Sequence, residues 1–228
     1  MSDEILAMTA MQLRAHFSDR QLSPVDVASA MLDQIERVDS HTNGFCLVDR
    51  ETSLALARES EQRYDAGAPQ GLLDGVPVAV KDVFLTPMWP TLKGSHTVDP
   101  HSTLGKTGAC TAALARHGYV PIGKTTTPEL GWKGVTDNPV DGVTNNPWNP
   151  DKTSGGSSGG SGVAVALGMA PMALGTDAGG AIRIPAAFCG IVGLKPSRMR
   201  TPHGPDLSSV WESMCGEFVM SRTVRDSA

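Results

Sequence analysis

The sequence has few aromatic residues, and it lacks the features that are typical of nucleic-acid-binding and membrane-spanning proteins. Aromatic side chains make up 5% of its 228 residues, and 24 acidic residues outnumber 19 basic ones. The basic residues are scattered along the chain, so they form no basic stripe of the kind that nucleic-acid binding needs. No apolar run approaches the ~18 residues of a membrane-spanning helix. We therefore expect neither a nucleic-acid partner nor a membrane partner.

The cysteines are also uninformative as a metal or disulfide framework. Four occur, far apart, and none forms a C-x-x-C pair. This spacing is typical of reduced thiols when a secretory signal is missing. The first residues are acidic and lack the basic region that opens a signal peptide. We expect a cytoplasmic protein.

Helical and strand patterns are mixed along the chain, which predicts an α/β fold. Ser23 and Pro24 suit a helix start, and apolar residues recur at helical spacing from there. The continuous apolar run 76–80 predicts a buried strand. The expected helices cover residues 24–38, 49–64, 109–117 and 163–169, and the expected strands 45–48, 76–80, 119–122, 172–174 and 190–194. We expect a mixed, mostly buried β-sheet flanked by helices, with a helical N-terminal segment.

Glycine concentrates late in the chain, and residues 153–162 contain only Gly, Ser and one Thr. A flexible linker of this composition would have polar flanks, but an apolar helix is predicted directly after it. Such a turn offers backbone N–H groups to an anion or oxyanion. Residues 155–159 match G-x-S-x-G and residues 118–125 match G-x-x-x-x-G-K-T. We interpret both matches as chance, because neither has the strand–turn–helix context that its chemistry requires.

Several segments read together resemble the amidase signature family. They occur in the family's order, and the resemblance covers the chain from about Ser23 to its end. The matching segments are residues 73–82 (the lysine strand), 145–148, 155–162 (the Gly/Ser segment), 175–186 (the nucleophile loop) and 190–196.

The resemblance implies a Ser-cisSer-Lys triad that hydrolyses a carboxamide to an acid and ammonia or an amine. Lys81 matches the family's base, and Ser157 matches the serine that follows a cis peptide bond and relays the proton. Position 181 matches the nucleophilic serine, but this chain has Ala181 there. The implied triad fits the reaction, because a hydroxyl that attacks an amide needs a base and an oxyanion site. A buried lysine can be that base, since burial favours its neutral form.

The nucleophile loop carries the remaining predicted site residues. Its glycines leave backbone N–H groups open to a developing oxyanion, namely those of Ala178, Gly179, Gly180 and Ala181. Support of the loop is expected from Ser158, Thr176, Asp177 and Arg183. The last two are expected to be structural, because a charged pair can hold a loop in shape.

The residues by themselves leave other roles open. Lys81 could pair with Asp82 at a strand end, and Ser157 could be a turn or capping serine. The glycines of the nucleophile loop could serve only a tight turn, which is compatible with an oxyanion role.

Ala181 has no hydroxyl, so we expect this chain to be inactive, since loss of a nucleophile typically costs ~10³–10⁶ in rate. We interpret it as a deliberate Ser-to-Ala change, because the other motif residues are intact; a natural pseudoenzyme is the alternative. The resemblance also implies a domain about twice this long. Residues 1–228 are then the N-terminal half of a single domain, with a helical segment over 1–68 and the catalytic motifs over 69–228.

Two further functions stay open. The A subunit of a tRNA-dependent amidotransferase shares these motifs, although residues 129–132 and 145–148 look more like those of free-standing amidases. A non-catalytic amide-binding protein would also fit Ala181. The resemblance implies a small-molecule amide as the ligand, no metal or organic cofactor, and a homodimer as the assembly.

Overall fold

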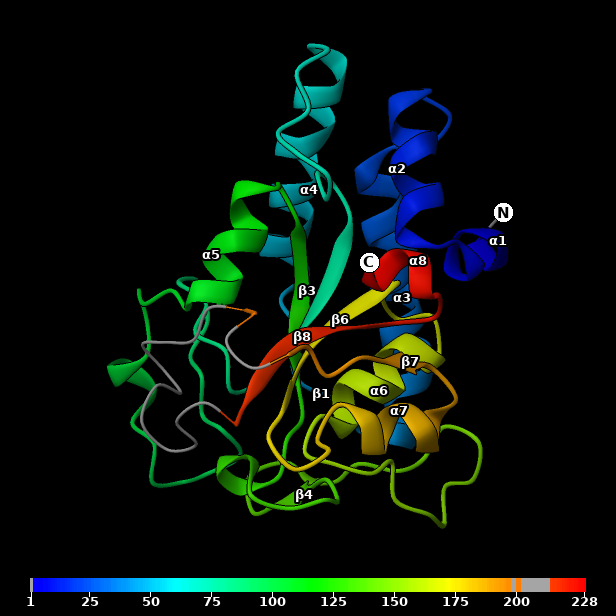
Figure 1. The fold of residues 1–228 in the computed structure, drawn as a ribbon. Helices are drawn as coiled ribbons and strands as arrows, with labels where there is room; N and C mark the ends of the chain where they lie inside the picture. The colour runs from blue at the N-terminus through cyan, green and yellow to red at the C-terminus, as the bar shows by residue number, and fades with distance from the viewer. Residues whose placement is uncertain (1, 198–199, 202–213) are drawn as a thin grey trace.

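The computed structural model describes residues 2–197, 200–201 and 214–228, and Figure 1 shows its helices and strands. Its helices are α1 (Ser2–Ala7), α2 (Ala10–Ser18), α3 (Pro24–Thr42), α4 (Arg50–Asp65), η1 (Pro100–Ser102), α5 (Ala109–Arg116), η2 (Glu129–Gly131), α6 (Gly159–Ala166), α7 (Arg183–Cys189) and α8 (Val224–Ser227). Its strands are β1 (Phe45–Leu47), β2 (Pro77–Lys81), β3 (Val120–Thr125), β4 (Asp137–Asn138), β5 (Gly142–Val143), β6 (Met172–Asp177), β7 (Val192–Gly193) and β8 (Gly216–Ser221).

The main sheet is mixed, which confirms the predicted α/β class. Its strand order is β1-β3-β2-β6-β8-β7, and β4 and β5 form a separate two-stranded hairpin. Strand β2 runs parallel to both β3 and β6, whereas β1, β8 and β7 are antiparallel to their neighbours. The parallel strands β2 and β6 bring their carboxyl ends to one edge of the sheet, where Lys81 and Thr176 lie.

Helices flank the sheet, so its central strands are buried. All residues of β2, β3 and β6 are buried. Helix α6 contacts β2, β3, β6 and β8, while α3 and α4 pack against each other and against β3. The apolar run of β2 is thus covered by the helices, as expected for a strand without polar alternation.

Helix α3 shows why the predicted N-terminal helix forms. The Ser23 hydroxyl accepts from the backbone N–H of Val25 at 2.9 Å, and Pro24 occupies the first turn. Val27, Met31 and the other apolar positions of its stripe are buried. The helix continues one turn beyond the predicted residue 38 and ends at Thr42, and the capping residue Asn43 has a left-handed conformation (φ 54°).

The structure corrects the predicted bounds of the helix that follows the Gly/Ser segment. Helix α6 begins at Gly159, within that segment, and ends at Ala166 instead of at residue 169. Glycine permits this start, because a Cβ on Gly160 would lie 2.3 Å from the carbonyl oxygen of Gly44. The sequence analysis also missed α7 and β8, and the strand expected over 190–194 is only the two residues of β7.

The two ends of the described chain lie side by side, with α8 next to α2 (Figure 1). The backbone N–H of Met11 donates to Asp226 at 3.2 Å, and Arg222 donates to the carbonyl oxygen of Met8 at 2.6 Å. Among the described residues, no helix has the length and apolarity to cross a bilayer.

Candidate active site

Lys81 is the last residue of β2 and the centre of the site. Its side chain is fully buried, and Nζ donates to three hydroxyls. The distances are 2.7 Å to Ser157 Oγ, 3.0 Å to Ser158 Oγ and 2.7 Å to Thr176 Oγ1. Across the described part of the chain, Lys81 forms no ion pair, and Asp82 pairs instead with Lys124. The structure therefore does not support the alternative in which Lys81 is held by Asp82.

Burial changes the protonation of Lys81. Removal from water disfavours the ammonium form and lowers the pKa of Lys81 to about 7, although Cys215 and Asp177 act in the opposite direction. Near neutral pH a large fraction of this amine is uncharged. An uncharged amine has a lone pair, so it can accept a proton from a neighbouring hydroxyl.

The two serines that contact Lys81 stand at the start of α6. The peptide bond between Gly156 and Ser157 is cis, at the place where the resemblance put it. The backbone N–H of Ser158 donates to the carbonyl oxygen of Ala181 at 3.1 Å, and its hydroxyl lies 3.3 Å from both the N and the O of Thr176. Ser158 thus links the Gly/Ser segment to β6 and to the nucleophile loop.

The nucleophile loop is held by a bidentate ion pair. Arg183 Nε and Nη2 donate to the two carboxylate oxygens of Asp177 at 2.8 and 2.9 Å. Burial alone would raise the pKa of Asp177, but the hydrogen bonds from Arg183 and from the backbone N–H of Gly180 outweigh it and lower the pKa. This geometry agrees with the predicted structural role of the pair, because an ionised carboxylate with these donors fixes both ends of the turn.

Hydrogen bonding selects among the four predicted oxyanion donors. The N–H of Gly180 donates to Asp177 Oδ1 at 2.7 Å, so it is not open to a substrate as the sequence analysis expected. Within the described residues, the N–H groups of Ala178, Gly179 and Ala181 make no hydrogen bond. These three residues all line the cavity next to the triad positions. Three of the four predicted donors are therefore left without a partner among the described residues, and Gly180 is not.

A cavity of about 160 Å³ brings the predicted residues together. Ser157, Thr176 and Ala181 all contribute to its lining. The sequence analysis did not assign the residues that complete the wall, which are Val83, Leu130, Gly131, Trp132, Lys133, Gly134, Gly156, Ile184 and Cys215. Gly156 and Ile184 lie inside the matching segments, and Leu130, Gly131 and Trp132 lie within residues 129–132, but the sequence analysis assigned none of them a role in a site. Cys215 precedes a strand that was not predicted.

The loop that carries Leu130 is shaped by its backbone. Leu130 and Gly131 both have positive φ, at 53° and 71°. The loop is anchored where the Leu130 N–H donates to the carbonyl oxygen of Lys93 at 2.8 Å, and where Glu129 accepts from Ser95 at 2.8 Å. This turn places Leu130 and Trp132 on the cavity wall.

The arrangement places a buried amine beside hydroxyls and next to the turn of the nucleophile loop, but position 181 holds only a methyl group. Among the described residues there is no group of three or more His, Cys, Asp or Glu side chains placed to hold a metal ion. The site therefore has the parts for acyl transfer except the attacking oxygen.

Comparison with known proteins gives one consistent result. The Amidase family profile matches residues 26–228. The A subunit of the glutamyl-tRNA(Gln) amidotransferase of Thermobifida fusca (strain YX) is 42% identical over 194 residues, which cover 85% of this chain and 39% of that protein. The putative amidase AmiB2 of Mycobacterium tuberculosis (strain ATCC 25618 / H37Rv) is 39% identical over 227 residues, which cover 100% of this chain and 48% of that protein.

A solved structure of the same family has a similar fold. The crystal structure of a bacterial aryl acylamidase of the amidase signature enzymes superposes with a TM-score of 0.88 at 33% identity, covering 97% of this chain and 46% of that one. The chain thus spans less than half the length of each of these relatives.

Proposed function

The chain belongs to the amidase signature family of hydrolases, and from this premise we propose that the protein, with serine at position 181, hydrolyses a carboxamide to a carboxylic acid and ammonia or an amine. The observation that carries the proposal is the environment of Lys81. This fully buried amine contacts three hydroxyls and, in the part of the chain that the structure describes, no carboxylate. Two of the residues that bear these hydroxyls, Ser157 and Thr176, line the same cavity as position 181.

The proposed reaction moves one proton along a short chain of groups. The serine at position 181 passes its proton to Ser157, which passes one to the neutral amine of Lys81, while the serine oxygen bonds to the amide carbon. The carbonyl oxygen becomes an oxyanion that the N–H groups of Ala178, Gly179 and position 181 stabilise. The proton returns to the leaving nitrogen as the C–N bond breaks, and water then releases the acid from the acyl-enzyme by the same steps.

With Ala181 the same site binds an amide but forms no acyl-enzyme. No other oxygen nucleophile stands at that position, since the alanine side chain ends in a methyl group. Whether the alanine is a deliberate substitution or marks a pseudoenzyme, the surrounding triad residues retain the contacts that a proton relay needs.

The decisive experiment restores the hydroxyl. We expect Ala181→Ser in the full-length protein to raise hydrolysis by ~10³-fold or more over the alanine form. A panel of aliphatic, aryl and fatty amides, followed by release of acid, measures the gain. The matched control is the double variant Ala181→Ser with Lys81→Ala, which should return to the background. A folded Ala181→Ser protein without turnover on the whole panel would contradict the proposal.

The cavity wall supports amides with an uncharged acyl part. Val83, Leu130, Trp132 and Ile184 supply apolar side chains. The cationic residue among the described wall residues, Lys133, is ion-paired with Asp137. Aryl and short branched acyl groups should therefore be hydrolysed faster than acyl groups that carry a carboxylate, because the wall offers little to compensate a desolvated charge.

A second candidate is the A subunit of a tRNA-dependent amidotransferase, which the 42% identity to such a protein favours. That function would pass ammonia to a partner instead of releasing it. It predicts that the Ala181→Ser protein releases ammonia from an amide only when a charged tRNA and the partner protein are present. Equal rates with and without them would exclude it.

A further inference from the structure

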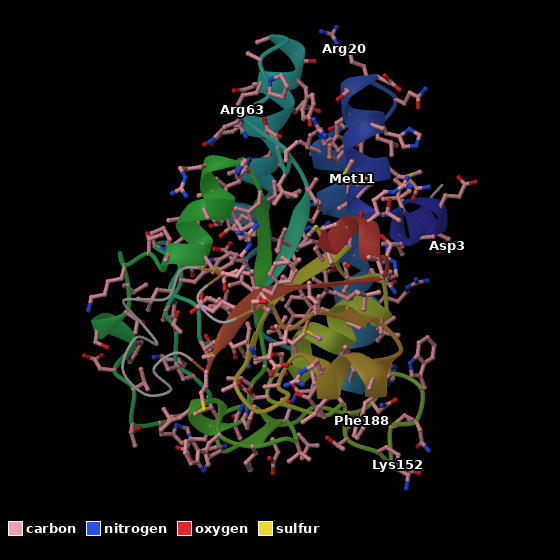
Figure 2. All side chains as sticks on the ribbon, viewed as in Figure 1. Asp3, Met11, Arg20, Arg63, Lys152 and Phe188 are labelled. Carbon is pink, nitrogen blue, oxygen red and sulfur yellow. The ribbon has the colours of Figure 1, made fainter. Side chains whose placement is uncertain are left out.

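A second cavity, of about 240 Å³, lies between α4 and α5. None of its lining residues belongs to the cavity beside Lys81. It is lined by α4 on one side, by α5 on the other, and by the start of β3 where Tyr119 and Pro121 lie. Figure 1 shows α4 and α5 next to each other along β3. In Figure 2, Arg63 on α4 lies far from Phe188 of α7, the helix that follows the nucleophile loop.

Tyr119 gives this cavity an unused polar group. Its side chain is 8% exposed, and within the described residues its hydroxyl makes no hydrogen bond. Burial raises the pKa of Tyr119 well above its usual value, so the hydroxyl stays neutral and can donate or accept. Among the described residues this hydroxyl is not one of the fully buried polar atoms without a partner, and Tyr119 lines the cavity, so the oxygen is accessible to water or to a ligand.

Arg63 adds a second donor whose charge is already compensated. Nε and Nη2 donate to the buried carboxylate of Asp74 at 3.0 and 2.6 Å, and no hydrogen bond among the described residues uses Nη1. Glu59 stands one turn earlier on α4 and lines the same cavity. The guanidinium disfavours a cationic ligand and the Glu59 carboxylate an anionic one, so the lining favours a neutral head that both donates and accepts.

The rest of the wall combines apolar side chains with Gln70, Thr107 and Thr111, and Gln70 and Thr111 already donate to backbone carbonyls. Leu56, Met88 and Pro121 contribute carbon surface to the lining. An apolar cavity of about 150 Å³ can hold benzene, so 240 Å³ accommodates a molecule somewhat larger than one ring.

We propose that the cavity between α4 and α5 binds a small uncharged alcohol with an aromatic or aliphatic body, its hydroxyl bonded to Tyr119 and facing Arg63 and Glu59, and its body against Leu56 and Met88. The site is separate from the amide-hydrolysing centre, so the proposal holds whether or not the protein is an amidase.

Benzyl alcohol is the probe, with toluene, benzylamine and benzoate as ligands of similar shape but different head groups. Each is titrated into the protein labelled with ¹³C at the methionine methyl groups, and the Met88 signal is identified by its loss in Met88→Leu. We expect a saturable shift of the Met88 signal with benzyl alcohol, with a Kd on the order of 1 mM for a ligand of this size. The three other ligands should bind at least several-fold more weakly.

Two variants connect the binding to the proposed contacts. Tyr119→Phe should weaken benzyl alcohol about three- to tenfold, the value of one neutral hydrogen bond, and leave toluene unchanged. Tyr64→Phe is the matched control, because Tyr64 bonds to the carbonyl oxygen of Asp74 and does not line the cavity. Ala115→Phe, at an exposed position of α5 on the cavity rim, should block all four ligands while the protein stays folded by circular dichroism.

The proposal is overturned if Met88 shows no saturable shift with benzyl alcohol, or if benzylamine or benzoate binds as tightly. It is also overturned if Tyr119→Phe, folded, binds benzyl alcohol as well as the unmodified protein does.

Discussion

Two fully buried lysines on adjacent strands differ in one respect, the chemistry of their partners. Lys124 of β3 lies 3.2 Å from a carboxylate oxygen of Asp82, and it also donates to the carbonyl oxygen of Phe84 at 2.8 Å and to Thr91 at 2.7 Å. Lys81 lies on β2, where its neighbour Val80 pairs with Lys124 in the sheet, and its partners among the described residues are all hydroxyls.

We infer from this difference a structural role for Lys124 and a catalytic role for Lys81. A buried ammonium is costly unless an opposite charge compensates it. Asp82 offers Lys124 an opposite charge, and this contact ties the end of β2 to β3, although burial raises the pKa of Asp82. Lys81 has no such partner within the described ranges, and burial lowers its pKa to about 7. The same residue type, equally buried, thus has a carboxylate partner in one place, and in the other it has the hydroxyl surroundings in which we propose that it acts as a base.

The largest expected effect is the loss of amide hydrolysis when Lys81 is replaced. In the protein with Ala181→Ser, we expect Lys81→Met to reduce amide hydrolysis by ~10³-fold or more, because the serine loses its base. The melting temperature should stay the same or rise, since methionine fills similar volume without a group that must be desolvated. Parallel rate and melting measurements test this. A large loss of stability together with the loss of rate would mean that Lys81, too, is structural.

The structural lysine should show the reverse pattern. Asp82→Asn leaves the buried Lys124 without its carboxylate, and we expect a loss of about 3–5 kcal/mol in the free energy of unfolding, measured by urea denaturation. Adding Lys124→Met to that variant should recover part of the loss, because the uncompensated charge is gone. If Asp82→Asn alone leaves the unfolding midpoint unchanged, the two lysines do not differ as described.

The pH dependence sharpens the contrast. Only neutral Lys81 accepts a proton, so the rate of the Ala181→Ser protein should rise about tenfold per pH unit below 7 and level off above it. The pKa of Lys81 is lower in the folded chain than its unfolded value of ~10.4. Between these values the unfolded chain binds more protons, so the contribution of Lys81 to stability increases with pH.

Lys81→Met should therefore stabilise the protein most below pH 7, and this advantage should shrink as the pH rises toward 10. Melting curves of both proteins across that range provide the measurement. An advantage that does not vary with pH would show that Lys81 keeps its ordinary pKa.

The smallest expected effect concerns one hydroxyl partner. Ser158→Ala removes the 3.0 Å contact with Lys81 and the link to Thr176. We expect a loss of about 1 kcal/mol in stability and up to about a tenfold lower rate in the Ala181→Ser protein. Ser161→Ala, which removes a hydroxyl from the same helix but from no contact with Lys81, should lower stability by a similar amount and leave the rate nearly unchanged. Equal rate losses in both variants would argue against a special role for Ser158.

The sequence by itself determined the family, the fold class and the positions at which the triad is proposed. Local chemistry made this possible: Ser23 and Pro24 start a helix, an uninterrupted apolar run forms β2, and the lysine, the Gly/Ser segment and the nucleophile loop occur in a recognisable order. Each of these signals lies within a few consecutive residues, so no folded structure is needed to see it.

Only the tertiary structure decided which groups meet. Lys81 contacts Ser157 and Thr176, which lie 76 and 95 positions further along the chain. Its apparent neighbour Asp82 pairs with Lys124 instead, and Asp177 occupies the Gly180 N–H that was expected to serve the substrate. These outcomes depend on strand register and on competition between distant partners for the same hydrogen bond, and neither is encoded in the spacing of residues along one segment.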